Sequence, residues 1–294
     1  MSAAPKLSII VGAIGVPASL AACLAAIERQ RRAGEVEVIV VAEAAAAVGG
    51  LAGDVRLVRA AGPRLMPELW EIGINHSAGE IVALTTAHFV PRGDWVAQIL
   101  KAHAAPHPAI GGAIENSAEA GLADWAVYFC RYSQFMLPFP AAAARDLAGD
   151  NAAYKRRALE RYREERRAGF WEPLIHAAMM RDGYELRLTP EIVVEHQSSF
   201  GVAEFIRQRF WHGRQFGSGR ANVMPAWRRL AYLLLSPLIP AALLWRIARR
   251  VLARRRHAGK LLLAAPILLV FLLGWAAGEA SGYLRPQRRG QPHA

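Results

Sequence analysis

Short apolar runs alternate with amphipathic segments in the first third of the chain. The apolar runs have the length of buried strands, and the segments between them carry apolar residues at helical spacing. We predict strands at Leu7–Val11, Glu37–Val41, Val55–Val58 and Ile81–Thr85, and helices at Ser19–Arg32 and Trp70–His76. Strands that alternate with helices form a parallel sheet of βαβ units, so the predicted fold class is α/β.

Ligands of such sheets bind outside the carboxyl ends of the strands. This rule brings Gly12–Gly15, Ala42–Glu43 and Thr85–His88 to one rim of the predicted sheet. In an α/β enzyme that uses a nucleotide, acidic residues at this rim would hold a metal ion. The turn instead reads Thr86-Ala87-His88.

The rest of the chain changes character twice. In its middle part we predict strands at Ile110–Ile114, Tyr184–Leu188 and Ile192–Glu195, and helices at Trp125–Met136, Asn151–Arg167 and Trp171–Arg181. From Trp227 onward, two uncharged apolar runs, Leu230–Trp245 and Leu261–Gly278, flank a basic segment. We therefore predict two domains, residues 1–225 and residues 226–294.

The net charge of the chain and the position of its arginines indicate which partners it binds. Lys and Arg number 36 against 24 Asp and Glu, and the formal net charge is +12. Such a basic chain needs an anionic partner. The arginines lie beside apolar runs, and the sequence has no zinc-finger spacing, RNP motif or helix-turn-helix signature. We therefore predict anionic membrane lipids and no nucleic acid. Two cysteines, Cys23 and Cys130, indicate neither a disulfide framework nor a cysteine-based metal site.

The two apolar runs are expected to meet a bilayer differently. Leu230–Trp245 spans about 24 Å as a helix, short of the roughly 30 Å hydrocarbon core, and Pro237 interrupts it. We predict a re-entrant or interfacial segment there, with the basic Arg246–Lys260 at the cytoplasmic face, as the positive-inside rule favours. Leu261–Gly278 is long enough to span, but a shallow hairpin bent at Pro266 is favoured over a true span.

Five segments follow one another in an order typical of one family. They are Leu7–Val11 with a helix ending in Glu28-Arg29-Gln30, Gly79–Thr85, Pro91 with Asp94-Trp95, Gly149–Arg156, and Gly183–His196. Together they resemble the family 2 glycosyltransferases, specifically the membrane-associated bacterial members, over roughly residues 6–200. Order and spacing carry this resemblance, because no single motif is specific.

The resemblance implies a GT-A (Rossmann-like) domain followed by C-terminal hydrophobic membrane helices. It implies an inverting hexosyltransferase of cell-envelope polysaccharide biosynthesis. Such an enzyme moves a sugar from a nucleotide-sugar donor to a lipid-linked or polysaccharide acceptor. The implied location is the bacterial inner membrane, with the catalytic domain facing the cytoplasm. The alternative is a non-catalytic, membrane-bound GT-A-like binding or scaffold protein with a decayed metal site.

Individual residues take on expected roles from the resemblance. Glu172 aligns with the catalytic base, since the family's usual Glu-Asp pair reads Trp171-Glu172 here. The alternative is a first-turn glutamate that compensates the helix dipole. The nucleotide sugar is expected to contact Gly12, Glu43, Thr86 and His88. Asn151 is expected on the acceptor side, as a phosphate or acceptor contact.

The segment Arg207–Arg214 mixes basic and aromatic residues after the last predicted strand. Its position resembles that of the Q-x-x-R-W motif of processive synthases, although the spacing does not match. Arg209, Trp211 and Arg214 are therefore candidate phosphate or acceptor contacts. A plain interfacial amphipathic stretch is the alternative.

Metal binding is left open by the sequence. The family's D-x-D aligns with Thr86-Ala87-His88, so both acidic positions are replaced. His88 falls at the third position of the D-x-H found in the polypeptide N-acetylgalactosaminyltransferases, with His196 as a second candidate ligand. Two histidines without a carboxylate make a weak Mn²⁺ or Mg²⁺ site unless the diphosphate supplies oxygens. The alternative is that His88 forms a hydrogen bond near the nucleotide and that arginine and lysine side chains balance the negative charge of the diphosphate.

Overall fold

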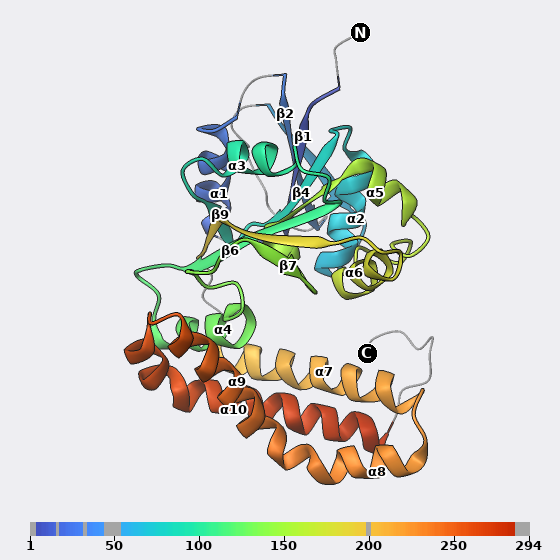
Figure 1. The fold of residues 1–294 in the computed structure, drawn as a ribbon, viewed down its shortest axis with the longest axis vertical. Coiled ribbons are helices and arrows are strands. Elements are labelled where there is room, and N and C mark those ends of the chain that lie inside the picture. Colours follow the sequence, from blue (N-terminus) through green and yellow to red (C-terminus); the bar gives the residue numbers. More distant parts are fainter. Residues whose placement is uncertain (1–3, 16–17, 32–33, 44–53, 198–200, 286–294) are drawn as a thin grey trace. The chain divides into compact units, whose positions relative to one another are not determined.

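The computed structural model describes residues 4–15, 18–31, 34–43, 54–197 and 201–285. The chain divides into two compact units, residues 1–117 with 135–198 and residues 118–134 with 199–294. The first unit holds the sheet, and the second is helical (Figure 1). The sequence predicted a single boundary near residue 225, whereas these units divide near residues 117, 134 and 198.

One mixed sheet organises the first unit. Within the described residues its strands are β1 (Leu7–Ala13), β2 (Val36–Glu43), β3 (Val55–Ala60), β4 (Ile81–Thr86), β5 (Phe89–Pro91), β6 (Ala109–Asn116), β7 (Ala142–Ala144), β8 (Ala152–Lys155) and β9 (Leu186–His196). Their order is β3-β2-β1-β4-β8-β6-β9-β5, and β7 pairs with β9. The first four strands pair in parallel, whereas β8 runs antiparallel to both β4 and β6.

Helices cover both faces of this sheet, which is why a strand such as β1 is apolar and buried along its whole length. On one face, buried side chains of α2 (Met66–His76), α5 (Arg156–Arg161) and α6 (Glu172–Arg181) form a single hydrophobic cluster with the strands. The helices α1 (Ser19–Glu28) and α3 (Trp95–Ala102) lie on the other side (Figure 1). The predicted α/β class is therefore confirmed.

The predicted helix Asn151–Arg167 is wrong. A 3₁₀ turn, η1 (Gly149–Asn151), leads into β8, and the α-helix covers only Arg156–Arg161. Strand β8 lies between β4 and β6, and the side chains of its first three residues are buried. Burial in the middle of a sheet overrides a weak helical preference.

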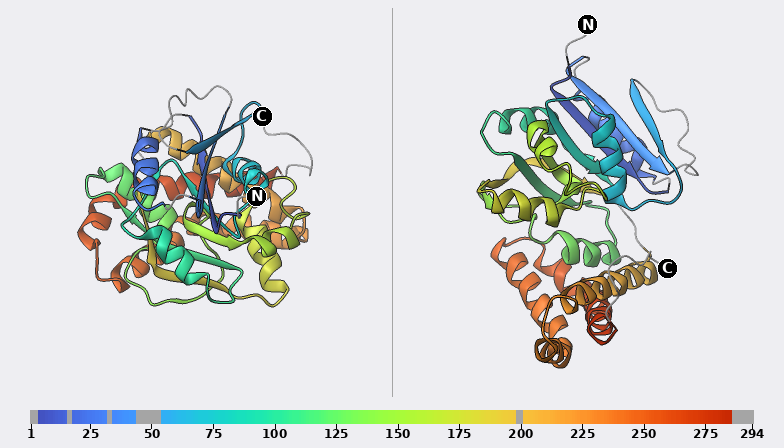
Figure 2. Two further views of the ribbon diagram at one scale, coloured as in Figure 1. Left: turned by 90° about the horizontal axis from the view of Figure 1, so that it is seen from above. Right: turned by 90° about the vertical axis from the view of Figure 1, so that its right-hand side faces the viewer.

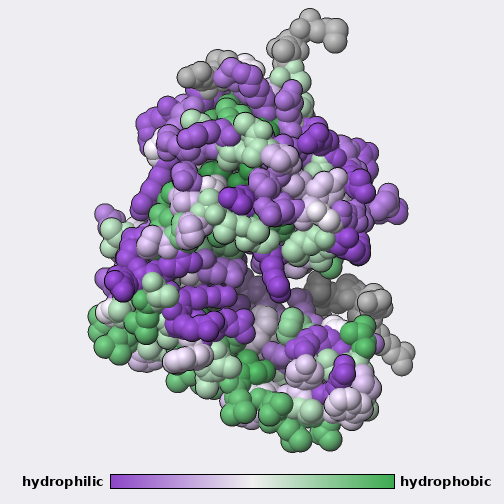
Figure 3. All heavy atoms as spheres, in the orientation of Figure 1, coloured by the Kyte–Doolittle hydropathy of each residue, from purple (hydrophilic) through white to green (hydrophobic). Residues whose placement is uncertain are grey.

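The second unit consists of helices in its described part. They are α4 (Leu122–Tyr132), α7 (Val202–Ala221), α8 (Ala226–Leu235), the 3₁₀ turn η2 (Ser236–Leu238), α9 (Ile239–Ala253) and α10 (Ala258–Leu284). Among the described residues, Ala226–Ala253 and Ala258–Leu284 are long and apolar enough to cross a membrane. Many of their large apolar side chains are exposed, and apolar residues gather over this unit in Figure 3.

The predicted hairpin at Pro266 is wrong, because α10 is one continuous helix. Proline removes one main-chain hydrogen bond, but packing against neighbouring helices keeps such helices intact. Here α10 packs against α4, α7 and α9, and Pro266 itself faces outward. Pro237 does interrupt the first apolar run, although only by the short turn η2.

Glycines bring α7 and α10 into direct main-chain contact. A Cβ atom at Gly278 would lie 2.0 Å from the Phe210 carbonyl oxygen, and one at Gly217 would lie 2.3 Å from that of Glu279. The contacts advance along both helices together: Ile206 with Gly274, Phe210 with Gly278, and Arg214 with Gly282. The two helices therefore run parallel, held by the small-residue packing that is common between membrane helices.

A buried carboxylate lies in the same interface. Glu279 accepts hydrogen bonds from the Trp275 Nε1 group at 2.9 Å and from the Tyr283 hydroxyl at 2.7 Å. The Arg220 guanidinium, from α7, lies 3.7 Å from its Oε1 atom. The charge on this apolar helix is thus paired, as buried charges must be.

We expect Gly217→Ala to destabilise the helical unit by roughly 1–3 kcal/mol, since the new methyl group meets main-chain atoms that must shift. Gly219→Ala is the matched control on the same helix, because nothing lies within 4 Å of its added Cβ atom. That change should stabilise by roughly 0.5–1 kcal/mol through helix propensity. Thermal unfolding in detergent measures both. Equal effects of the two changes would contradict the glycine contact.

Candidate functional site

The predicted rim exists at the carboxyl ends of β1, β2 and β4. Gly12 is in register with Val41 on one side and with Thr86 on the other. The main-chain N–H of Ala87 donates a hydrogen bond to the Gly12 carbonyl oxygen at 2.9 Å. The stretches that the sequence assigned to one rim therefore adjoin one another.

Trp70, on α2, connects this rim to the opposite side of the site. Its Nε1 group donates to the Thr85 carbonyl oxygen at 2.9 Å, and the side chain is only 3% exposed. A Cβ atom at Gly12 would lie 3.5 Å from Trp70 Nε1. At the other edge of the indole, a Cβ atom at Gly149 would lie 2.7 Å from a ring carbon. The indole therefore forms a common wall for Gly12 and Gly149.

Glu172 lies beside that wall. The main-chain N–H of Gly149 donates to its Oε1 atom at 3.1 Å, and a Cβ atom at Gly149 would come within 2.7 Å of the same oxygen. Glu172 is in the first turn of α6, as the helix-dipole alternative requires, but its carboxylate is partly buried and bonds a different segment. Burial, and then the Asp150 carboxylate, raise the pKa of Glu172 to about 7.

Asn151 holds the turn on which Glu172 rests. Its Nδ2 group donates to the carbonyl oxygens of Ala113 at 2.8 Å and Ile192 at 3.0 Å, while its Oδ1 atom accepts from Trp95 Nε1 at 2.8 Å. These bonds fill the place where the register of β6 and β9 shifts. Asn151 is 1% exposed, so its amide holds this part of the fold from within. Its expected place on the acceptor side stays a prediction.

A chain of polar contacts near Glu172 joins two buried side chains, His176 and Tyr154, to the exposed Asp146. His176, one turn further along α6, contacts the Asp146 carboxylate through Nδ1 at 2.9 Å and the Tyr154 hydroxyl through Nε2 at 2.9 Å. Tyr154 belongs to β8 and is fully buried. Burial raises the pKa of its hydroxyl, and the Glu172 and Asp146 carboxylates raise it further. The chain ties α6 to the sheet and to the segment that leads into η1.

The remaining predicted donor contacts differ in their surroundings. Thr86 is 3% exposed, and within the described residues neither its Oγ1 atom nor that of Thr85 has a hydrogen-bond partner. Glu43, at the end of β2, accepts the main-chain N–H of Arg64 at 3.1 Å. Buried polar groups normally find partners, so the two hydroxyls at the rim are chemically suited to a ligand.

His88 and His196 occupy adjacent positions where β5 meets β9. Phe89 pairs with His196, and the Gln197 N–H donates to the His88 carbonyl oxygen at 2.8 Å. His196 is buried, with its ring 5.2 Å from that of Phe89 and its Nδ1 atom 3.3 Å from Asn116 Oδ1. His88 is only partly buried.

His88 and His196 alone would make a weak site for a divalent ion. Hard ions such as Mg²⁺ and Mn²⁺ prefer carboxylate oxygens, and the rim offers imidazole and hydroxyl groups near His88. Among the described residues, no group of three or more His, Cys, Asp or Glu side chains is arranged to hold a metal ion. His88 and His196 as metal ligands therefore stay a prediction.

Arg209, Trp211 and Arg214 belong to the second unit, whereas Gly12 and Glu172 belong to the first. The Arg209 guanidinium lies 4.3 Å from the centre of the Trp275 ring, and Arg214 donates to the Ser281 hydroxyl at 3.3 Å. Arg209 and Arg214 thus contact α10, whereas the Trp211 ring contacts Phe210 and Arg214 on its own helix. Their role as phosphate contacts stays a prediction.

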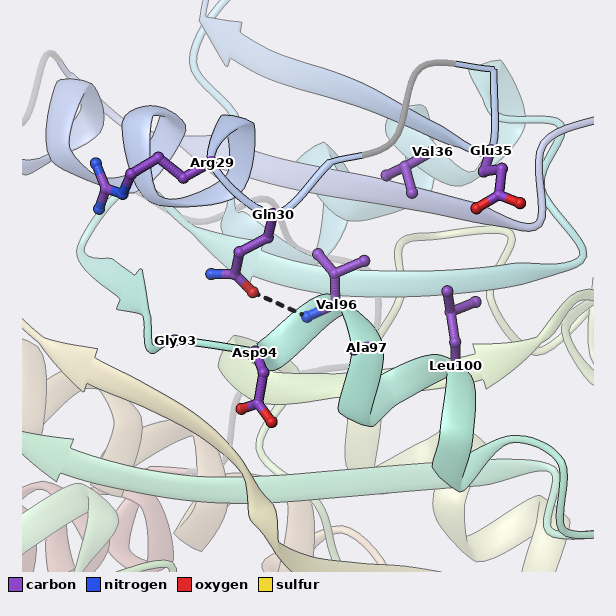
Figure 4. Close-up of a pocket in the computed structure, with 9 residues that line it drawn as sticks. All are labelled: Arg29, Gln30, Glu35, Val36, Gly93, Asp94, Val96, Ala97 and Leu100. Carbon is purple, nitrogen blue, oxygen red and sulfur yellow. Dashed lines mark hydrogen bonds between the residues drawn. The ribbon is translucent and has the colours of Figure 1, made fainter.

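A pocket of about 420 Å³ opens elsewhere in the first unit, between the end of α1, the start of β2 and α3 (Figure 4). The Val96 N–H donates to Gln30 Oε1 there at 3.1 Å, and the Asp94 side chain points away from Gln30. Because this pocket borders the beginning of β2, it lies at the other end of that strand from Glu43. It is therefore separate from the rim.

No protein-family model and no curated protein sequence matches the chain. Its fold is similar to that of a solved structure, the mannosyltransferase PcManGT from Pyrobaculum calidifontis in complex with GDP-Man and Mn²⁺. The TM-score is 0.57 at 20% sequence identity, and the match covers 95% of this chain and 88% of that one. The chain therefore has a glycosyltransferase fold, which confirms the predicted GT-A class. Membership of family 2 stays a prediction.

Sequence reasoning missed two residues that the fold brings to Glu172. Trp70 was read only as the start of a helix, and its contacts with two glycines far apart in the chain have no local signal. Asp150 was passed over as part of a motif. An acidic residue between two motif positions, Gly149 and Asn151, is a signal that could have drawn attention to it.

We expect Asn151→Ala to lower the free energy of unfolding by roughly 3 kcal/mol, because buried carbonyl groups and the Trp95 N–H lose their partner. Asn75→Ala is the control, since Asn75 is exposed and bonds Glu71 on its own helix. That change should stay within about 0.5 kcal/mol. Chemical denaturation followed by tryptophan fluorescence measures both. A similar small loss in both variants would contradict the anchoring role.

Proposed function

We propose that the protein is a membrane-associated glycosyltransferase that moves a sugar from a nucleotide-sugar donor to a lipid-linked or polysaccharide acceptor. The observation that carries this proposal is Glu172. A partly buried carboxyl group with a pKa of about 7 lies across Trp70 from the rim, in a fold similar to that of a mannosyltransferase. A general base works best when its pKa is near the working pH.

The reaction proposed is a single inverting displacement. The acceptor hydroxyl oxygen forms a bond to the anomeric carbon, while the bond from that carbon to the donor diphosphate breaks. The electron pair leaves with the nucleoside diphosphate, and the hydroxyl proton passes to Glu172. Trp70, packed between Gly12 and Gly149, excludes water from the region between donor and base.

The donor side is proposed to be formed by Gly12, Glu43, Thr86 and His88. The side-chain position of Gly12 is filled by Met66, whose Sδ atom would lie 2.3 Å from an added Cβ atom, so Gly12 is proposed to adjoin the donor only through its main chain. The Thr86 hydroxyl, which has no hydrogen-bond partner within the described residues, is available to hydrogen-bond a diphosphate or ribose oxygen. Glu43 can accept hydrogen bonds from ribose hydroxyls. His88 can donate to phosphate. PcManGT was solved with Mn²⁺. Thr86-Ala87-His88 supplies no carboxylate for such an ion, and no step above depends on one.

The bacterial inner membrane is the proposed location, with the α/β unit on the cytoplasmic side. Two apolar helical stretches and a basic segment between them support this proposal. Exposed leucine and tryptophan side chains on α8, α9 and α10 suit a lipid environment. The arginines beside them suit anionic headgroups. Arg209, Trp211 and Arg214 are proposed to contact phosphate groups of lipid or substrate.

A donor screen tests this function directly. Purified protein in detergent or vesicles is given a panel of nucleotide sugars and candidate lipid acceptors, and release of nucleoside diphosphate is measured. We expect one donor class to be turned over and Glu172→Gln to lower the rate by at least about 100-fold, since it removes the base but keeps size and hydrogen bonding. Donor binding by the variant should persist. Donor binding without turnover by the wild type would instead favour the scaffold alternative.

Stability supplies an internal control for this variant. The folded pKa of Glu172 lies above its ordinary value of 4.5, so folding favours the protonated form. Charging the group therefore lowers stability as pH rises from about 4.5 to about 7. Glutamine avoids that loss, so above pH 7 the variant should unfold at the same temperature as the wild type or higher. A lost activity with intact stability then reports on the base alone.

We expect His88→Ala to weaken donor binding about tenfold, the worth of one hydrogen bond to a charged group. Calorimetric titration with the donor that is turned over measures the change, with Mn²⁺ and with EDTA. His107→Ala is the control, since His107 precedes β6 at the end remote from Asn116. An equal loss in both buffers indicates direct contact, and a loss only with Mn²⁺ indicates a metal ligand. No loss in either buffer would refute both roles.

A further inference from the structure

The turn η1 brings a second carboxylate to Glu172. Gly149, Asp150 and Asn151 are consecutive, and hydrogen bonds hold the first and the last of them to different parts of the fold. Gly149 donates to Glu172 and cannot carry a side chain there, and Asn151 is bonded inside the sheet. Asp150 is partly buried, and its main chain is held beside Glu172 by these two neighbours.

We propose that Asp150 is a positioning residue of the acceptor side, whose negative charge makes Glu172 a stronger proton acceptor for the substrate hydroxyl group. This inference rests on the proposed function. Where the family usually has a Glu-Asp pair, this sequence has only one carboxylate, because Trp171 precedes Glu172. The fold supplies a second one from a different segment of the chain, the turn η1.

Several other ionisable groups lie around Glu172. Asp146 precedes the turn, Tyr154 is on β8, and His176 is one turn along α6. The pKa of Glu172 responds first to burial, next to Asp150 and only weakly to Asp146. Asp150 is therefore the neighbour whose charge acts most directly on the base.

For the reaction, the Asp150 charge has two opposing effects: it raises the proton affinity of Glu172 and lowers the fraction of Glu172 that is ionised. A like charge nearby raises the proton affinity of Glu172, so the base pulls the proton more strongly once it is ionised. The same charge delays ionisation, so less of the base is ready below pH 7. In the transfer step the proton leaves the acceptor oxygen as that oxygen bonds the anomeric carbon. It then resides on Glu172, stabilised by Asp150.

Two isosteric variants of the full chain test the inference. Asp150→Asn removes the charge beside Glu172, and Asp146→Asn is the matched control that removes the weaker charge. The ionisation of Glu172 is followed by infrared absorption of its carboxyl group against pH. The band is assigned by subtracting the spectrum of the same chain carrying Glu172→Gln. This titration needs no substrate, and thermal unfolding checks that each variant is folded.

We expect Asp150→Asn to lower the pKa of Glu172 by about 1, and Asp146→Asn to lower it less. The acid limb of the transfer rate should move with it, so that the variant gains activity relative to the wild type near pH 6 and loses about two- to threefold on the alkaline plateau. An unchanged titration, or a larger shift with Asp146→Asn, would overturn the inference. So would a folded Asp150→Asn protein that is inactive at every pH, because Asp150 would then contact substrate itself.

The two proposals fail in different ways. If the titration shifts as expected but no donor is turned over by the wild type, the pairing of the carboxylates stands and the proposed function falls. If transfer occurs and the titration does not shift, the function stands and the role of Asp150 falls.

Discussion

The amide of Asn151 is the constraint on which the candidate site depends. It satisfies main-chain groups of β6 and β9 where their register shifts, and it holds the indole of α3 in the same hydrogen-bonded set. The residue at the start of this turn, Gly149, packs against the Trp70 indole and donates a hydrogen bond to Glu172. An internal hydrogen-bond network of the sheet thus positions the turn that contacts Trp70 and the partly buried Glu172.

The early part of the fold was predictable because each strand carries its own signal. Leu7–Val11 and Glu37–Val41 are buried on both faces, so an apolar run marks them. The strand β8 gave no such signal, since Ala-Ala-Tyr followed by arginines suits a helix equally well. Its pairing with β4 and β6 is a long-range choice. The two strands predicted on either side of Pro190 form one strand, β9, because the pairing of β6 with β9 continues past the shift.

The candidate site was only partly predictable for the same reason. The rim residues follow from strand ends, and Glu172 followed from alignment with a family motif. Neither Trp70 nor the interaction of Asp150 with Glu172 could be read from spacing, because each depends on a turn whose course is set by Asn151. The loss of acids in Thr86-Ala87-His88 was visible at once. What the sequence could not reveal is that a neighbouring pair of threonine hydroxyls is buried and unpaired within the described residues.

The parallel pairing of α7 with α10 has a consequence for synthesis on the ribosome. The sheet of the α/β unit is complete once β9 has been made, so this unit can fold early. Helix α7 emerges next, yet the surface that receives its glycines lies on the last helix, with α8 and α9 made in between. Until α10 follows, the close-packed face of α7 has no partner. Assembly of the helical unit therefore waits for the synthesis of α10, and a chain stalled before α10 would leave the glycine face of α7 uncovered.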